Sequence, residues 1–326
     1  FSTQPASQTI CSTDSVTFTV ATTGGTPTTY NWQYRVNTSG TFTNISAANS
    51  DSYIIASDLT SANTGNQYRC VVDQATSNPV ISAIATLTVN DLPAFSSTLA
   101  NQTVCTSAAN VTFTANATGT GLSYQWQLST NAGADWNDVG SANASTYVIN
   151  APTTALSGNQ YRVVVTGQAP APCNTPITSE AAILTVNQAV AIGTNPTAQV
   201  ICPSATANFS ISGVTGSGLT YQWFATNGSP VSLTNGATGS GATVSGANSA
   251  TLAITTPIEF NNFSFYCVVS GIAPCSSATS TAAALTFYNK AVYSIGTGGD
   301  FTNLTSAIAQ LQSCGIAQAT ILELNA

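Results

Sequence analysis

Short stretches of alternating polar and apolar residues follow one another along most of the chain, which is the pattern of half-buried β-strands. In SVTFTV, residues 15–20, the apolar side chains Val16, Phe18 and Val20 would share one face of a strand. In TYNWQY, residues 29–34, alternate aromatic residues would do the same. Glycine-rich segments such as TGTGLS separate these stretches, and no helical periodicity of useful length precedes residue 288. The pattern predicts an all-β protein.

The predicted strands recur with a period of about 95 residues, so the chain contains three copies of one unit. The phrase GNQYRCVV at residues 65–72 returns as GNQYRVVV at residues 158–165 and as NFSFYCVV at residues 262–269. Each copy also has an early cysteine and, in its third predicted strand, a tryptophan. We therefore expect units over residues 1–90, 91–187 and 188–288, followed by a different segment over residues 289–326.

About seven short strands in about 95 residues is the inventory of a β-sandwich. A tryptophan on the third strand, a Gly-x-x-Tyr entry to a later strand and a final LTV strand resemble the immunoglobulin-like (Ig-like) sandwich. The YQWQ and YRVVV strands are similar to Ig-like repeats of secreted surface proteins and adhesins of Bacteroidota-type bacteria. This resemblance covers residues 1–288 and implies three tandem Ig-like β-sandwiches. It also implies type IX secretion and a place on the extracellular surface of a bacterial cell.

The repeated phrase places one tyrosine, Tyr68 or Tyr161, at the corner before a strand. In the Ig-like fold such a tyrosine buries its ring while its hydroxyl bonds nearby backbone. The third copy has Phe265 there, so its hydrogen bond would depend on Tyr266. A sugar-binding aromatic platform is the alternative role for these rings. We expect the core between the sheets to contain Tyr68, Tyr161, Trp32, Trp126 and Trp223.

Eight cysteines in a chain with 5% charged residues suggest disulfide bonds and an oxidising compartment. A zinc site is disfavoured because the sequence has neither a Cys-x-x-Cys pair nor a histidine. In antibody domains a disulfide joins the second and sixth strands. Here Val20 occupies the second-strand position, so this sequence departs from that pattern. We therefore expect each early cysteine to pair within its own unit, and Cys314 has no assigned partner. The predicted pairs are Cys11–Cys70 and Cys105–Cys173, with Cys202 joined to either Cys267 or Cys275.

The last segment changes character, with a predicted strand in AVYSI, a glycine-rich turn in GTGGDF and a second strand in ATILEL. Between them, Leu304, Ala307, Ile308 and Leu311 have helical spacing, and Gly315 would end the helix. This stretch resembles the N-terminal cap of pectin-lyase-like right-handed β-helices. A dinucleotide-binding turn is disfavoured because Phe301 replaces the third glycine of G-x-G-x-x-G.

The charged residues are too few and too scattered for most chemistry. Four basic residues (Arg35, Arg69, Arg162 and Lys290) and a net charge of −7 argue against nucleic-acid binding. No apolar run reaches the roughly 18 to 20 residues of a membrane-spanning helix. Asp135 and Asp138 flank Trp136 in a predicted hairpin, where we interpret them as solvated turn residues. We expect no cofactor, with Asp91 in the VNDLP linker as a candidate calcium ligand.

These observations favour a non-catalytic structural or adhesive stalk region of a large secreted cell-surface protein. Three sandwiches in tandem would form a rod that binds an extracellular protein or glycan and is exported by secretion machinery. One alternative is a set of spacer modules for a polysaccharide-active β-helix enzyme whose catalytic residues lie beyond Ala326. Another is a carbohydrate-binding module that uses Trp136.

Overall fold

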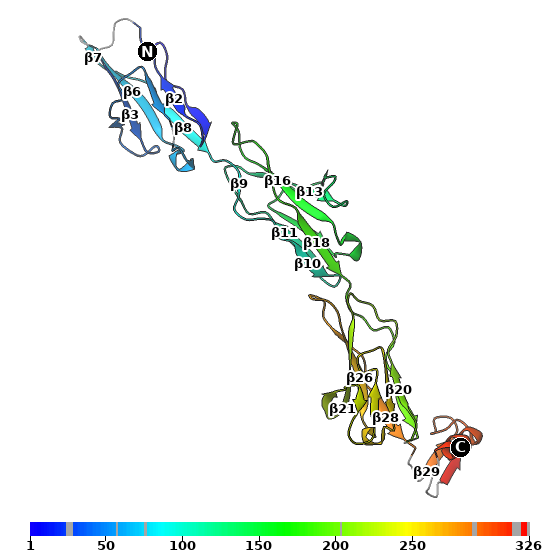
Figure 1. The fold of residues 1–326 in the computed structure, drawn as a ribbon. Coiled ribbons are helices and arrows are strands. Elements are labelled where there is room, and N and C mark those ends of the chain that lie inside the picture. The colour runs from blue at the N-terminus through cyan, green and yellow to red at the C-terminus, as the bar shows by residue number, and fades with distance from the viewer. Residues whose placement is uncertain are drawn as a thin grey trace. The chain divides into compact units, whose positions relative to one another are not determined.

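The structure is a computed structural model that describes residues 1–23, 29–56, 58–74, 77–202, 204–288, 292–314 and 321–324. Its strands form three Ig-like β-sandwiches in chain order, followed by a small C-terminal element (Figure 1). The all-β prediction is confirmed. Contact density divides the chain into two compact units, and the strands of the second sandwich contribute to both. The repeat bounds given above therefore stay predictions.

The first sandwich has one sheet in the order β1-β8-β6-β3-β4, with β7 paired to β6, and a facing pair β2-β5. Strand β1 runs parallel to β8, and the other paired strands are antiparallel. A short 3-10 helix precedes β6, at Ser61–Asn63. The strands are β1 (Gln8–Cys11), β2 (Val16–Thr19), β3 (Thr29–Arg35), β4 (Thr43–Asn44), β5 (Ser52–Ile55), β6 (Gln67–Gln74), β7 (Ser77–Ile81) and β8 (Ala85–Asn90).

The second sandwich repeats this plan with the sheet β10-β18-β16-β13-β14, to which β17 is added, and the facing pair β11-β15. A further pair, β9-β12, lies at its start, and a 3-10 helix occupies Thr154–Leu156. The strands are β9 (Ala94–Phe95), β10 (Gln102–Cys105), β11 (Asn110–Thr114), β12 (Ala117–Thr118), β13 (Ser123–Ser129), β14 (Asn137–Asp138), β15 (Thr146–Asn150), β16 (Gln160–Thr166), β17 (Ile177–Thr178) and β18 (Ala182–Asn187).

The third sandwich has the sheet β19-β28-β26-β21-β22 with β27 added, and its facing sheet grows to β20-β25-β24-β23. Its 3-10 helix is Ile258–Phe260. The strands are β19 (Gln199–Ile201), β20 (Ala207–Ser210), β21 (Thr220–Asn227), β22 (Ser229–Ser232), β23 (Gly236–Ala237), β24 (Thr243–Ser245), β25 (Thr251–Thr255), β26 (Ser264–Ser270), β27 (Ala278–Thr279) and β28 (Ala283–Phe287).

The C-terminal element consists of β29 (Val292–Ile295), α1 (Leu304–Ser313) and β30 (Ile321–Leu324). Helix α1 begins after Asn303, whose side chain accepts a hydrogen bond from the backbone N–H of Ser306 at 2.8 Å. Strands β29 and β30 pair in parallel, which requires a connection of this length between them. Gly315, the expected end of the helix, lies outside the described residues.

Each sandwich core is built around one tryptophan. The three indoles are 0% exposed, and each indole N–H donates a 2.9 Å hydrogen bond to a backbone carbonyl of its own sandwich. This bond satisfies the one polar group that burial of an indole removes from water. The indoles are those of Trp32, Trp126 and Trp223, and the carbonyls belong to Ser50, Ala144 and Ser249.

The corner tyrosines are buried beside these indoles. The Tyr68 ring stacks on Phe18 at 4.7 Å between centroids, and the Tyr161 ring contacts Phe113 at 4.8 Å. Burial raises the pKa of Tyr68 to about 12, against a lowering by a side-chain hydrogen bond with Asn66.

In the third sandwich, Phe265 packs on Phe209 at 4.7 Å, which is where the other two have a tyrosine. Tyr266 does not replace the missing hydroxyl. Its ring lies on the outer face of the sheet, stacked on Phe224 at 5.2 Å.

Candidate functional site: disulfide junctions between successive elements

Three disulfides connect different folded elements of the chain. Each joins the early cysteine of one sandwich to a cysteine of the next element, over sequence separations of 162, 170 and 112 residues. The Cα–Cα distances of 5.5, 5.2 and 5.0 Å lie in the usual range for disulfides. The bonds are Cys11–Cys173, Cys105–Cys275 and Cys202–Cys314.

The predicted pairs within units are therefore wrong. Cys11 is not bonded to Cys70, Cys105 is not bonded to Cys173, and Cys202 is bonded to neither Cys267 nor Cys275. The physical reason is the direction of the side chains. Cys70 is paired with Trp32 in the middle of the sheet and points into the core, whereas Cys11 ends β1 at the edge of the sandwich.

Cys70 and Cys267 are free and act as core residues. Both are 0% exposed, and each stands opposite the sandwich's tryptophan in the sheet. Val163 occupies the same place opposite Trp126 in the second sandwich, so a small apolar side chain is what the position requires. Burial raises the pKa of the Cys70 and Cys267 thiols to about 11, which keeps them protonated and unreactive at neutral pH.

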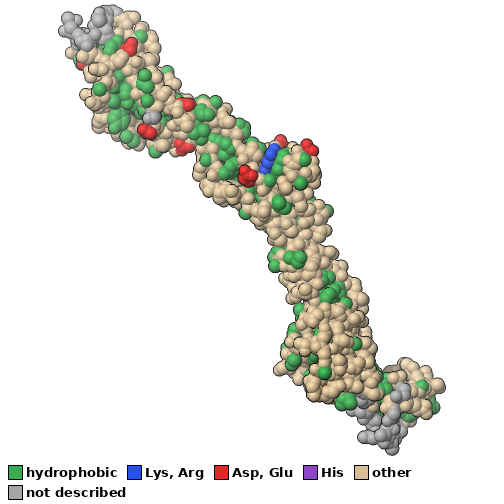
Figure 2. Space-filling model, viewed as in Figure 1, with side chains coloured by type: hydrophobic (Ala, Val, Ile, Leu, Met, Phe, Trp, Pro, Cys, Tyr) green, Lys and Arg blue, Asp and Glu red, His purple; other side chains and the backbone are tan. Residues whose placement is uncertain are grey.

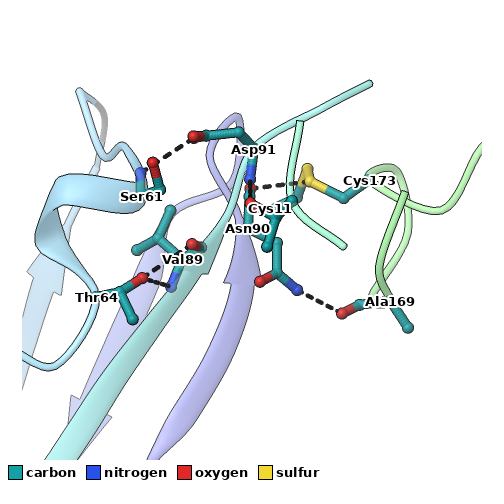
Figure 3. Close-up of a disulfide and its surroundings, with 9 residues drawn as sticks. Cys11, Ser61, Thr64, Val89, Asn90, Asp91, Ala169 and Cys173 are labelled. Atoms are coloured by element: carbon teal, nitrogen blue, oxygen red, sulfur yellow. Dashed lines mark hydrogen bonds between the residues drawn. A yellow bond between two sulfur atoms is a disulfide. The ribbon is translucent and has the colours of Figure 1, made fainter. Parts of the chain in front are cut away.

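The first junction forms where β8 leaves the first sandwich (Figure 3). Cys11 lies beside Asn90 because β1 runs parallel to β8, and the N–H of Ser12 donates to the Asn90 carbonyl at 2.8 Å. The Asn90 amide then reaches the next sandwich, where its nitrogen donates to the Ala169 carbonyl at 2.6 Å. The sulfur of Cys173 lies 2.9 Å from the Asn90 carbonyl oxygen, and because it carries no proton this is a close contact only. Asn90 thus contacts both sides of the disulfide.

The residue after Asn90 closes the junction further. The Asp91 carboxylate accepts a hydrogen bond from the N–H of Ser61 at 3.0 Å, which holds it to the first sandwich. Its own N–H donates to the Thr120 hydroxyl of the second sandwich at 2.8 Å, and Thr120 returns a 3.2 Å bond to the Asp91 carbonyl. Asp91 is therefore bonded to the first sandwich through its side chain and to the second through its backbone. Asp91, the candidate calcium ligand, serves here as a hydrogen-bond acceptor.

The second junction repeats the asparagine contacts and the linker backbone bonds of the first. Asn187 accepts a 2.9 Å hydrogen bond from the N–H of Thr106 and donates from its side chain to the Ala273 carbonyl at 3.2 Å. Gln188 exchanges hydrogen bonds with Ser217, at 2.9 and 3.2 Å, in the way that Asp91 does with Thr120. Two independent copies of the same contacts indicate that the junction is a built feature of the repeat.

A glycine gives each of these disulfides the space it needs. A Cβ atom placed on Gly167 would lie 2.4 Å from the Cys173 carbonyl oxygen and 3.3 Å from Pro93. At the matching Gly271, a Cβ would lie 2.8 Å from the Val190 side chain and 3.1 Å from the Ser217 carbonyl oxygen. Backbone atoms cannot move aside as a flexible side chain can. A larger residue at Gly167 would displace the backbone of Cys173, and one at Gly271 would displace Val190 and Ser217 beside the second disulfide.

The third junction uses different parts. Cys202 follows β19, as the other early cysteines end their strands, but its partner Cys314 is the C-terminal cap of α1. Tyr288 takes the place of Asn90 and Asn187, and its ring stacks on Phe301 at 5.4 Å. The C-terminal element is thus bonded to the third sandwich through a disulfide and an aromatic contact, without the asparagine bridge.

Little in the described residues suggests catalysis. They contain no group of three or more His, Cys, Asp or Glu side chains that would hold a metal ion. Asp135 and Asp138 are exposed and accept hydrogen bonds from Asn131 and Gln127, both at 2.8 Å. Among the described residues that line a cavity of about 530 Å³ beside the C-terminal element, Asp300 is the one carboxylate, whereas acid–base hydrolysis of a glycoside uses two.

One face of Trp136, the candidate sugar platform, is covered by an arginine. The Arg162 guanidinium lies 4.2 Å from its ring centroid, and its indole N–H donates to the Gly133 carbonyl at 3.1 Å. The surface seen in Figure 2 is largely uncharged. Within the described residues, no helix is long and apolar enough to cross a membrane.

Comparison with known proteins gives one family and one fold. The family described as a domain of unknown function (DUF8696) matches residues 2–91 and again residues 95–188. A search of curated proteins found no match. Among solved structures, the I-band fragment I67–I69 of titin has 15% sequence identity and a TM-score of 0.50, covering 88% of this chain and 97% of the fragment. A mutated variant of the same three titin domains has 14% identity and a TM-score of 0.50 over the same shares. At such identity the likeness concerns the fold alone, a tandem of three Ig domains.

Proposed function

The chain belongs to the family described as a domain of unknown function (DUF8696), and we propose that it is a non-catalytic stalk that carries mechanical load in a secreted cell-surface protein. The observation that carries this proposal is the overlap of the three disulfides. Cys105 lies inside the loop closed by Cys11 and Cys173, yet its partner Cys275 lies outside that loop. The same relation holds between the second and third disulfides. The three disulfides therefore overlap along the chain, and each one links an element covalently to the element that follows it.

Overlapping disulfides change how a pulling force passes through the chain. A disulfide within one sandwich protects that sandwich alone and leaves the linkers to bear the load. Here the force can enter at Cys11, cross to Cys173, follow the backbone to Cys202 and cross to Cys314. Most of the residues that form the sandwiches are bypassed. Unfolding of a sandwich would then release little length, which is the property a stalk requires.

The finer assignments rest on the resemblance described above. Disulfides and an Ig-like fold fit an extracellular protein. The YQWQ and YRVVV strands support a bacterial cell surface, an adhesin and export by the type IX route. The partner would be an extracellular protein or glycan of the host surface or of neighbouring cells.

Localisation and deletion in the producing organism test this proposal. Antibodies raised against the oxidised chain should label intact cells, and external protease should remove the label. An in-frame deletion of residues 1–288 should leave secretion intact but reduce attachment under flow, where load is applied, more than attachment at rest. Labelling only after the cells are opened would refute the surface assignment. Equal loss of attachment with and without flow would refute the load-bearing role.

The C-terminal element favours one second candidate, a spacer for a β-helix enzyme. Its parallel strands β29 and β30, joined through α1, are compatible with the first turn of a parallel β-helix. The sequence that follows Ala326 in the gene discriminates between the two candidates. Asp, Arg and Lys clustered at the period of successive turns would favour the enzyme, and further Ser-, Thr- and Asn-rich repeats would favour the adhesin.

A further inference from the structure

The first sandwich collects two of the chain's four basic residues at one place on the outer face of its larger sheet. Arg35 on β3 and Arg69 on β6 both lie over the ring of Phe42, at 4.7 and 3.9 Å from its centroid. Gln67 pairs with Arg35 across the two strands, and Gln33 pairs with Arg69. In a chain of net charge −7, two adjacent guanidinium groups without an intervening carboxylate form an unusual surface. We use the name arginine patch for Arg35, Arg69, Gln33, Gln67 and Phe42.

The side chains of the arginine patch are held in fixed orientations. Arg35 donates from Nε and Nη2 to the Gln67 side-chain oxygen, at 2.8 and 2.6 Å. Arg69 donates from Nε to the Gln33 side-chain oxygen at 2.7 Å, and the Gln33 amide nitrogen in turn donates to Asn44 at 2.8 Å. A guanidinium that is stacked on a ring and bonded at Nε has lost most of its rotational freedom, so binding costs it little further entropy.

The terminal nitrogens of Arg69 are left without an acceptor in the described part of the protein. These two nitrogens present the fork of donors that matches a carboxylate or sulfate. Asn44 accepts through its oxygen and so keeps its amide nitrogen as a further donor. On the same face of β6, the Asp73 carboxylate accepts hydrogen bonds from the Thr29 hydroxyl at 3.1 Å and the Asn31 amide at 3.3 Å. Among the described residues, the two guanidinium groups contact glutamine side chains, one backbone carbonyl and the Phe42 ring, so their charge stays available to an anionic ligand.

The second sandwich supplies an internal comparison. Arg162 is held in the same way as Arg69, with Nε donating to Gln127 at 2.7 Å and the guanidinium over Trp136. There, however, the position of Asn44 is taken by Asp138, which accepts the hydrogen bond from Gln127 at 2.8 Å. Ser129 stands in the strand where Arg35 would be. One cation beside an added carboxylate leaves no net positive charge, so the second sandwich should not attract an anion.

We propose that the arginine patch binds an acidic glycan, a saccharide that bears carboxylate or sulfate groups. The oxyanion would lie on the Arg69 fork beside the charge of Arg35, and the side-chain amide nitrogen of Asn44 would donate to a sugar hydroxyl. An acidic peptide is less suited to this place. Peptides gain affinity by adding a strand to a sheet edge or by burying apolar side chains in a groove. The arginine patch lies on the face of the adjacent strands β3 and β6, which pair with each other and with β4 and β8. This inference does not depend on the load-bearing role.

Titration calorimetry on the oxidised 326-residue chain tests the inference at about 0.1 M salt. The probes are an oligogalacturonate, a heparin-derived sulfated oligosaccharide, a neutral galactan of equal length and an oligoglutamate peptide. We expect at least one of the two acidic saccharides to bind. We expect the neutral saccharide not to bind. Because hydrogen bonds to charged groups contribute about 1.5–3 kcal/mol, R69Q should weaken binding about tenfold or more.

Two further variants separate the arginine patch from general charge effects. N44D gives the first sandwich the carboxylate that the second one has, and should weaken binding while keeping both arginines. R162Q removes the matched arginine of the second sandwich and should leave affinity unchanged. Circular dichroism and melting temperature check that each variant is folded. Equal binding of the neutral saccharide, equal binding of oligoglutamate, equal losses from R69Q and R162Q, or no binding of either acidic saccharide would each overturn the proposal.

Discussion

Stretching a single molecule by its two ends tests the overlapping disulfides directly. The shortest covalent route from Phe1 to Ala326 in the oxidised chain runs through Cys11–Cys173 and Cys202–Cys314. It contains about 50 residues of backbone, which at about 3.5 Å per residue gives an extension limit of about 180 Å. The reduced chain offers all 326 residues, or about 1,100 Å. Reduction should therefore lengthen the fully stretched molecule about sixfold.

Cysteine variants give graded values that depend on which bond is removed. The C11S/C173S double variant forces the route through Cys105–Cys275, which leaves about 155 residues or about 540 Å. The C105S/C275S double variant removes a bond that the shortest route does not use, so its limit should stay at about 180 Å. This variant is the matched control, because it loses as many cysteines without gaining length.

Optical tweezers with DNA handles at both ends measure these lengths with and without a phosphine reductant. The refuting result is specific. Bonds confined within units, such as Cys11–Cys70 and Cys105–Cys173, would leave about 130 residues in the route, or about 450 Å. An oxidised molecule that stretches to this length would contradict the junctions, and one that stretches to about 1,100 Å would show that no disulfide carries the load.

Other substitutions test single parts of the structure. Gly167→Val should slow or prevent formation of the Cys11–Cys173 bond, because its Cβ would meet the Cys173 carbonyl oxygen at 2.4 Å. Mass-spectrometric mapping of cystine peptides measures the yield of this bond, and a normal yield would contradict the steric argument. Cys70→Val should change the free energy of unfolding by less than about 1.5 kcal/mol, since Val163 fills the same position in the second sandwich. Chemical denaturation measures this change, and a larger loss would show that the thiol has a specific role. Burial raises the folded-state pKa of the Cys70 and Cys267 thiols to about 11, above the ordinary value for a thiol, so unfolding releases protons at alkaline pH. The free energy of unfolding should therefore fall as pH rises from about 9 to about 11. Both thiols should also resist iodoacetamide at pH 8 until the chain is denatured. Rapid labelling of the folded chain would show that the thiols are accessible.

The elements of the fold follow from patterns visible in the sequence. Period-two alternation identifies most core strands because each strand buries one face, and the recurring tryptophans mark the third strand of each sheet. The helical spacing of Leu304 and Ala307 corresponds to α1. These features are local, so a single sequence contains the information needed to predict them.

The disulfides do not follow from such local patterns, because each bond joins cysteines that belong to different elements of the chain. Cys70 is the one other cysteine of the first repeat, but the alternation of β6 points its side chain into the core and away from Cys11. The same alternation could have excluded it: Tyr68, Cys70 and Val72 share the buried face of β6. The arginine patch was also missed, because Arg35 and Arg69 meet only when two strands far apart in sequence are paired.

A numerical offset in the sequence does point to the correct pairs. An early cysteine occurs in all three repeats, whereas a cysteine after Ala-Pro occurs in the second and third repeats, at Cys173 and Cys275, and not in the first. If bonds formed within repeats, the first early cysteine would lack this kind of partner. If each early cysteine bonds forward, the first two meet Cys173 and Cys275, and the third must find a partner beyond the third repeat. Cys314 is that partner although it caps a helix, so the rule concerns the order of elements along the chain and does not require the next element to be an Ig-like sandwich.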